Sequence, residues 1–214
     1  DEKSVASVAG RVTNALLFGT NHPNGEFVTE QTLNNVTLAD VKQNYTSYFV
    51  PESAYLVVVG DVKFKDVKKQ VEKLFKDWKK ASAPVAKYAE PNDVAKTQID
   101  FVDMPNAVQS EIALVNTVNL KLTDKDYYAG LIANQILGGG GEGRLFLNLR
   151  EAHGWTYGAY SSLGSGKYTS KFTSSASVRN VVTDSAVVEF VNELQKIRTQ
   201  PVTQAELDLA KAKY

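Results

Sequence analysis

The chain has 214 residues, no cysteine, and 24 lysines and arginines against 24 aspartates and glutamates, so its net charge at neutral pH is zero. This balance leaves no global positive field to gather phosphates, which argues against nucleic-acid binding and against a membrane-surface role. The absence of cysteine excludes disulfides and thiolate sites, and no apolar stretch approaches the roughly 18 residues of a membrane span, so we expect a soluble protein.

Helices around one buried strand are predicted for the first 80 residues. Apolar residues recur at helical spacing over 5–16, and a capping box opens a second helix over 37–49. The continuous apolar run 54–60 (AYLVVVG) predicts a strand buried on both faces. The stretch 64–80 carries its apolar residues on one helical face, so it predicts an amphipathic helix beside that strand.

The rest of the sequence predicts an α+β fold. Two prolines among small and polar residues make 81–96 a linker. Beyond it we expect strands at 97–103, 111–118, 155–163 and 168–178, and helices from Thr123, over 144–153, over 181–198 and from Thr203. Strands joined mostly by hairpins, with helices grouped between them, indicate a two-layer sandwich of helices on a mixed or antiparallel sheet.

The sequence opens just before one predicted helix and closes inside another. The sequence begins at Asp1, with neither an initiating methionine nor a signal peptide, and a helical pattern follows. Thr203 and Glu206 form a capping box, and the sequence stops at Tyr214 within the helix that they begin. We therefore expect an excised piece of a longer protein.

A glycine-rich loop, 138–143 (GGGGEG), is the most distinctive local feature. It formally satisfies the dinucleotide fingerprint, but that fingerprint follows a strand, and here a helix precedes it. A phosphate-binding Walker loop is also excluded, because Arg144 and Leu145 stand where lysine and serine or threonine are required. The simpler interpretation is a helix-to-helix connection that needs positive φ angles.

The two histidines do not predict a metal site. His22 and His153 are far apart in the sequence, and neither has a metal-ligating side chain at the spacing of a helical site. His153 is interpreted more simply as a residue that a helix C-terminus favours. The sequence therefore predicts no metal site within this chain.

Arg150 and Tyr157 form a candidate binding pair. Arg150 lies in the last turn of the helix that follows the glycine loop, and Tyr157 lies in the strand after Gly154, so one short corner could direct both side chains to the same point. A guanidinium and a phenol there could bind a peptide carbonyl or a developing oxyanion. A helix-capping arginine and a surface tyrosine without a joint role are the alternative.

Several segments, taken in order, resemble one known family. The segment 137–160 (LGGGGEGRLFLNLREAHGWTYGAY) is similar to the signature of the pitrilysin/insulinase family of zinc metallopeptidases, the inverzincins, which include the mitochondrial processing peptidases. Shorter matches follow the family order at 22–25 (HPNG), 37–41 (TLADV), 48–51 (YFVP), 56–61 (LVVVGD) and 203–214. This resemblance implies a metallohydrolase-like fold, of the LuxS and processing-peptidase type.

The resemblance also implies that zinc and the residues that hold the substrate belong to different modules. The family's zinc motif, H-x-x-E-H, is not in this sequence, so zinc would belong to the full-length enzyme or to a partner half. This chain resembles the family's C-terminal, zinc-less module, in which an arginine and a tyrosine seven residues later hold the substrate backbone. These map onto Arg150 and Tyr157, with Gly139, Gly140 and Gly141 as further candidates for substrate contact.

The family's layout implies domain boundaries and a function. By that layout, 1–80 is the tail of a first α/β domain, 81–96 is a linker, and 97–214 is the head of a second, C-terminally truncated domain. We expect a substrate-positioning module of a zinc endopeptidase that hydrolyses small or unfolded polypeptides, with this piece inactive alone. The alternative is a non-catalytic structural or peptide-binding subunit of the same fold.

Partners and location follow from the same resemblance. The expected partners are a peptide substrate and a zinc-bearing domain, in the same chain or in another subunit. Because each half would lack strands, we expect exposed sheet edges, a joint sheet, or a homodimer that covers them. Resemblance to bacterial envelope peptidases favours a periplasmic or cell-envelope location, with the cytoplasm as the alternative.

Overall fold

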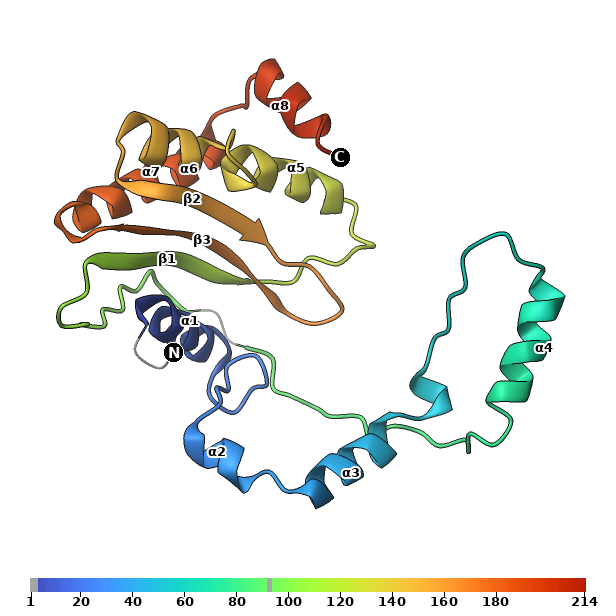
Figure 1. Ribbon diagram of the computed structural model, residues 1–214. Coiled ribbons are helices and arrows are strands. Elements are labelled where there is room, and N and C mark those ends of the chain that lie inside the picture. The colour runs from blue at the N-terminus through green and yellow to red at the C-terminus, as the bar shows by residue number, and fades with distance from the viewer. Residues whose placement is uncertain (1–3, 92–93) are drawn as a thin grey trace. The chain divides into compact units, whose positions relative to one another are not determined.

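A computed structural model describes residues 4–91 and 94–214, which form two compact units (Figure 1). The larger unit contains the described residues up to Phe27 together with those from Ala89 to Tyr214. The smaller unit is Val28–Tyr88. Among the described residues, no helix has both the length and the apolar character that crossing a membrane requires.

A three-stranded antiparallel sheet is the centre of the larger unit. Its strands are β1 (Gln109–Val118), β2 (Thr156–Leu163) and β3 (Ser170–Arg179), in the order β1-β3-β2. The predicted hairpin of β2 and β3 is confirmed, and the N–H of Gly164 donates to Lys171 O at 2.9 Å where the turn begins. The α+β class and the antiparallel sheet are thus as the sequence predicts.

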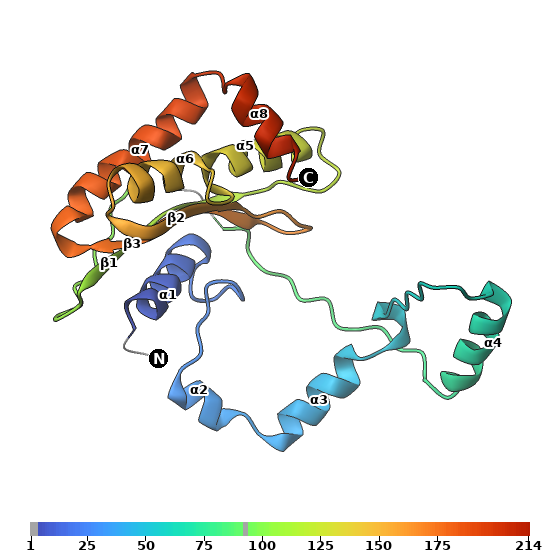
Figure 2. The same ribbon diagram turned by 45° about the horizontal axis from the view of Figure 1, so that its top comes forward.

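Helices cover one face of this sheet (Figure 2). They are α5 (Tyr127–Gly138), the single turn α6 (Arg144–Phe146) and α7 (Thr183–Thr199), followed by α8 (Gln204–Lys211). Alternate β3 side chains are buried beneath them because successive residues of a strand point to opposite faces. The buried apolar core comprises Ile112, Leu137, Leu145, Leu149, Ala159, Ala176, Val178, Ala186 and Phe190.

Helix α1 (Val5–Phe18) lies on the opposite side of the sheet from α5 and α7 (Figure 2). Ser4 caps its N-terminus, and it ends at Gly19, whose φ of 80° is a conformation that glycine adopts without strain. Lys171 Nζ donates to Asn14 Oδ1 at 2.7 Å. Because Lys171 alternates with the buried residues of β3, this bond ties α1 to the other face of the strand.

The smaller unit contains α2 (Glu30–Asn35), α3 (Leu38–Tyr48), the 3-10 turn Pro51–Ser53 and α4 (Phe64–Leu74). The predicted capping box of Thr37 and Asp40 is confirmed. Among the described residues of this unit, Val50 is the one buried apolar side chain. Long-range contacts are sparse, and one of them is the bond from Trp78 Nε1 to Phe49 O at 3.3 Å.

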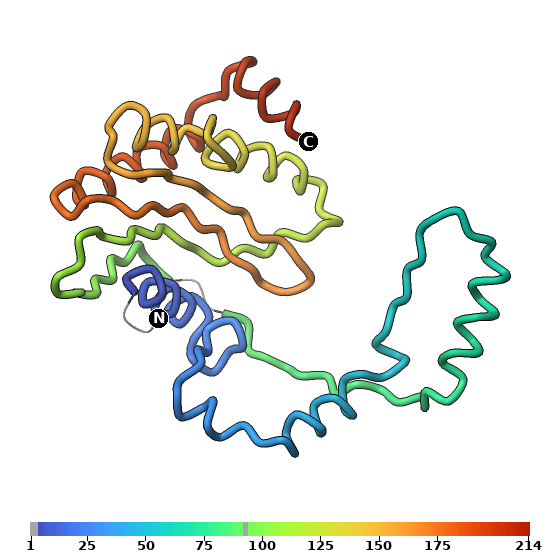
Figure 3. The backbone as a smooth tube through the Cα atoms, in the orientation of Figure 1, coloured from blue at the N-terminus to red at the C-terminus, as the bar shows by residue number. Residues whose placement is uncertain are grey.

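Two predicted strands are wrong. Residues 54–60 and 97–103 have no strand structure, and their backbone follows an irregular path (Figure 3). Their side chains are exposed rather than buried, with exposed fractions of 96% for Tyr55, 91% for Val59 and 91% for Ile99. A strand forms only when a neighbour pairs with its backbone, and nothing in the described part of the chain pairs with these two segments.

Helix boundaries differ more modestly from the prediction. The helix expected over 64–80 ends at Leu74, and the helix expected from Thr123 begins at Tyr127 without a side-chain cap. The helix expected over 144–153 is one α-turn followed by a π-helix, Leu147–Ala152. The larger unit also joins the described residues up to Phe27 to the C-terminal part.

Candidate functional site

A sharp corner connects the π-helix to β2, and Arg150 and Tyr157 lie on its two sides. Gly154 has a φ of 62°, and its N–H donates to Arg150 O at 2.9 Å. The N–H of Trp155 then donates to Leu149 O at 3.0 Å. A left-handed glycine followed by such bonds is the usual way to end a helix, so the predicted stop at Gly154 is confirmed. π-Helical turns are rare and occur often at functional sites.

A β-bulge exposes Tyr157. Thr156 pairs with Val178 and Ala159 with Ala176, so β2 uses one residue more than β3 over the same distance. In an unbroken strand Tyr157 would share the buried face of Ala159, but the extra residue between Thr156 and Ala159 breaks this alternation. The side chain is therefore 88% exposed. Its hydroxyl is available to a ligand.

Arg150 is held on the surface by two weak contacts. Its Nη1 lies 3.2 Å from Glu151 Oε1, and both side chains are about half exposed. Its Cζ lies 4.7 Å from the centroid of the buried Phe146 ring. Because an exposed ion pair contributes at most about 1 kcal/mol, the guanidinium can exchange Glu151 for another acceptor at little cost.

The glycine loop is explained by packing rather than by backbone conformation. None of the glycines of 138–143, all of them described, has a positive φ, so the expectation that the loop needs positive φ angles is wrong. A Cβ on Gly138 would lie 2.6 Å from Ser161 N, and one on Gly143 would lie 2.8 Å from the Cα of Gly138. The chain needs glycine at both positions because these backbones approach so closely.

The three glycines predicted to contact substrate differ from one another. A Cβ on Gly139 would lie 2.7 Å from the Cα of Gln135, so this glycine is required by packing. A Cβ on Gly140 or Gly141 would have ordinary contacts, at 3.6 Å from Gln135 Nε2 and at 3.7 Å from the Phe146 ring. Packing therefore does not require glycine at these two positions, and without side chains they leave their backbone open to a ligand.

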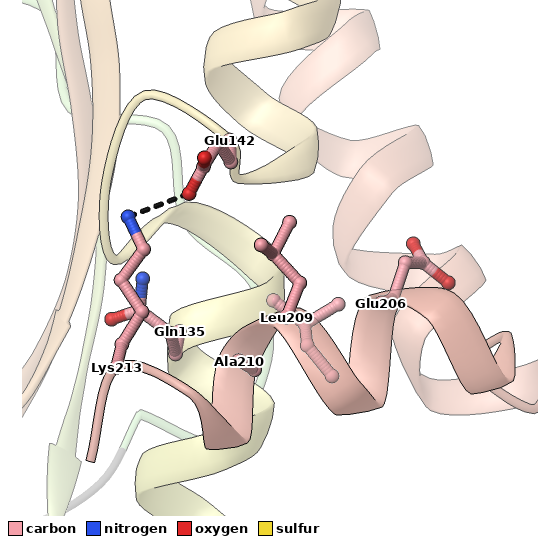
Figure 4. A pocket seen from close by; sticks show the side chains of 7 residues that line it. Gln135, Glu142, Glu206, Leu209, Ala210 and Lys213 are labelled. Carbon is pink, nitrogen blue, oxygen red and sulfur yellow. Dashed lines mark ion pairs between the residues drawn. The ribbon is translucent and has the colours of Figure 1, made fainter.

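Two ion pairs attach the end of this loop and the start of α6 to α8 and the residues that follow it. Arg144 Nε lies 2.6 Å from Glu206 Oε1, and its Nη2 lies 3.0 Å from Oε2. Lys213 Nζ lies 2.6 Å from Glu142 Oε2, across a small pocket between α5 and α8 (Figure 4). Hydrogen bonds from Arg144, and then from Thr203, lower the pKa of Glu206 to about 2. The carboxylate is thus charged at all ordinary pH values.

Neither histidine contributes to a metal site among the described residues. His153 stacks on Trp155 with ring centroids 4.0 Å apart, and His22 stacks on Phe18 and accepts the N–H of Asn24 at its Nδ1. Within 4–91 and 94–214, no group of three or more His, Cys, Asp or Glu side chains could hold a metal ion. The donor set of these residues does not fit zinc, which takes three or four such ligands.

Sequence reasoning missed two parts of this site. Phe146 was assigned no role, although its spacing of four residues from Arg150 is the helical spacing at which side chains meet. The pair of Arg144 with Glu206 spans 62 residues, and no local pattern predicts such a contact.

Comparisons with known proteins identify the family and the fold of the chain. Residues 35–214 match the family model described as the peptidase M16 inactive domain. A relative from Bacillus subtilis (strain 168), named probable inactive metalloprotease YmfF, is 24% identical over 191 residues, covering 89% of this chain. The crystal structure of a peptidase M16 inactive domain from Pseudomonas fluorescens is 25% identical, with a TM-score of 0.87 over 99% of this chain.

A more distant structure shows the same fold. The periplasmic protease PqqL from Escherichia coli is 19% identical, with a TM-score of 0.66, and the match covers 100% of this chain and 24% of that one. The present chain spans 43% of the length of the Bacillus relative and 51% of the Pseudomonas chain. The matched proteins are thus longer than this chain.

Proposed function

Because this chain belongs to the peptidase M16 family, whose inactive domain it matches over residues 35–214, we propose that it positions substrate for a zinc endopeptidase. The substrates are small or unfolded polypeptides, whose backbone is free to enter a site. The chain alone does not hydrolyse peptides in this proposal. Its contribution is to bind and orient the substrate, which by itself can supply a large part of catalysis.

The exposure of Arg150 and Tyr157 on the two sides of one rigid corner carries the proposal. The bulge in β2 turns Tyr157 out to solvent, and Arg150 stays about half exposed between Glu151 and the Phe146 ring. A guanidinium offers several N–H donors in a fixed plane, and a phenol offers one O–H donor. Together they can donate hydrogen bonds to successive carbonyl groups of an extended peptide. The open backbone of Gly140 and Gly141 adds room for that peptide to approach.

Hydrolysis itself is assigned to a zinc-bearing domain. The two histidines of this chain cannot form an H-x-x-E-H motif, and the described residues do not fit a zinc site. That domain belongs either to the same protein or to a partner subunit. No bond-breaking step is assigned to the residues of this chain.

The proposed arrangement of domains follows the family's layout. Residues 1–80 are the tail of one domain, 81–96 a linker, and 97–214 the head of a second. The apolar run 54–60, which is exposed and unpaired here, would pair with strands of the first domain. A homodimer that covers the same segment is the alternative, and size-exclusion chromatography with light scattering distinguishes the two.

The proposed location is the periplasm or the cell envelope. The structural likeness to a protease described as periplasmic supports it. A cytoplasmic location is the alternative, and fractionation of cells that express the complete protein tests both.

A zinc-dependent cleavage assay tests the proposed function. Unfolded β-casein is incubated with the complete protein, or with this chain and its zinc-bearing partner, with and without a zinc chelator. We expect cleavage that the chelator abolishes and that Arg150→Ala slows at least 100-fold, the usual effect of losing an oxyanion donor. Cleavage at an unchanged rate by Arg150→Ala would contradict the role of this arginine.

A non-catalytic subunit is the second candidate function. It is favoured by the relative that is named a probable inactive metalloprotease. In this case the complete protein binds casein but does not cleave it, whichever partner half is added. Binding without cleavage in the same assay would therefore select the second candidate.

A further inference from the structure

The ring of Phe146 is where three parts of the candidate site meet. Phe146 is buried at the end of α6, next to the fully buried Leu145. Arg150 of the π-helix stacks on its ring, with Cζ 4.7 Å from the centroid. A side chain on Gly141 would touch the same ring at 3.7 Å, so the glycine loop passes beside it.

Tyr160 of β2 supplies the third contact. Its ring centroid lies 5.7 Å from that of Phe146, with an interplanar angle of 40°. Tyr160 is itself restrained, because a Cβ on Gly158 would lie 2.5 Å from Tyr160 Cε2 and 2.8 Å from its hydroxyl oxygen. The tyrosine ring therefore lies against the glycine backbone inside the bulge that exposes Tyr157.

Burial fixes the orientation of an aromatic ring, whereas an exposed arginine side chain is free to change rotamer. An exposed arginine loses rotamer entropy when it binds a ligand. The face of an aromatic ring attracts a guanidinium and favours a parallel arrangement of the two planes. Because burial fixes the Phe146 ring, the ring restricts where Arg150 can place its donors before a ligand arrives. Glu151, the other partner of Arg150, is half exposed and gives no comparable restraint.

We propose that Phe146 is a positioning residue that orients the Arg150 guanidinium for peptide binding. The proposal depends on the peptide-binding role of Arg150 given above and adds a residue that acts only through Arg150. Phe146 itself does not touch the peptide. Its aromatic face, not only its volume, is what the site requires.

Side-chain NMR and peptide binding by the 214-residue chain test this role together. In the native chain we expect the ring current of Phe146 to shift the Nε–H and Cδ–H signals of Arg150 upfield, and the loss of these signals in Arg150→Lys assigns them. Phe146→Leu removes the ring and keeps an apolar side chain. Pentafluorophenylalanine at position 146 keeps the shape and reverses the charge distribution of the ring, so it is informative even if Phe146→Leu unfolds. Binding is measured by the anisotropy of fluorescein-labelled β-casein.

We expect both changes at position 146 to alter the Arg150 signals and to weaken casein binding about 3- to 10-fold, the effect of losing about 0.6–1.4 kcal/mol. Leu147→Ala, an exposed neighbour of Phe146 along the chain, should change neither quantity. Unchanged Arg150 signals, or changed signals with unchanged binding, would overturn the positioning role.

Arg150→Ala separates this proposal from the one on which it depends. If Arg150→Ala weakens casein binding and the changes at Phe146 do not, only the positioning role fails. If Arg150→Ala has no effect on binding, the proposed peptide-binding function fails as well.

Discussion

Phe190 in the larger unit and Phe64 in the smaller unit both lie on amphipathic helices, yet Phe190 is fully buried and Phe64 is 78% exposed. The helices form equally well in both units, because caps and periodicity act within a few residues. Burial differs because the larger unit offers a sheet face to its helices, whereas the described residues of the smaller unit contain no strand. An apolar helix face is thus a sign that a partner surface is needed, and it does not show where that surface is.

The largest expected effect comes from deleting the Phe190 ring, and Phe64 is the matched comparison. Phe190→Ala should lower the free energy of unfolding by about 3–5 kcal/mol, because it leaves a cavity in a packed core. Phe64→Ala should change it by less than about 0.5 kcal/mol, because no packing is lost. Urea unfolding followed by circular dichroism measures both. A large loss for Phe64→Ala would show that the smaller unit is buried in solution.

A smaller effect should separate the glycines of the loop. Gly138→Ala forces a Cβ to within 2.6 Å of Ser161 N and should cost about 1–3 kcal/mol. Gly140→Ala meets nothing closer than 3.6 Å and should change stability by less than about 0.5 kcal/mol. Equal thermal stabilities for the two variants would contradict the packing explanation of this loop.

The smallest effect is expected from the carboxylate that caps α8. Glu206 has a pKa of about 2, below its ordinary value, so its stabilisation is complete above about pH 5 and is lost as the pH falls towards 2. Because the pair with Arg144 is partly solvated, the loss should be roughly 1 kcal/mol. Glu206→Gln should remove this pH dependence.

Asp40 in the smaller unit is the matched control for Glu206. It caps α3 in the same way, and the hydrogen bond from Thr37 lowers its pKa, but it is fully exposed. Asp40→Asn should therefore leave the acid unfolding of the larger unit unchanged. A shift equal to that of Glu206→Gln would show that the two units unfold together.

Several features that depend on a few neighbouring residues were predictable from the sequence. The capping boxes at Thr37 and Thr203, the stop at Gly154 and the β2–β3 hairpin are all found where the sequence places them. Each depends on local hydrogen bonds or on a glycine's tolerance of positive φ. Arg150 and Tyr157 were also singled out from their positions around Gly154.

Features that depend on distant partners were not predictable. The runs 54–60 and 97–103 have strand composition, but pairing requires an edge that the described chain does not offer them. The exposure of Tyr157 depends on a bulge against β3, which shifts the alternation by one residue. The contact of Arg144 with Glu206 joins positions 62 residues apart, and only the fold brings them together.

The effect of Tyr157→Phe on the proposed peptidase activity of the complete protein tests the central claim most directly. This change removes one exposed hydroxyl and leaves the ring and the bulge in place. With β-casein as substrate, kcat should fall by about 10²- to 10³-fold. Tyr168→Phe, at another exposed tyrosine, should leave kcat unchanged. An unchanged kcat for Tyr157→Phe would contradict the assignment of this corner as the site that holds the substrate.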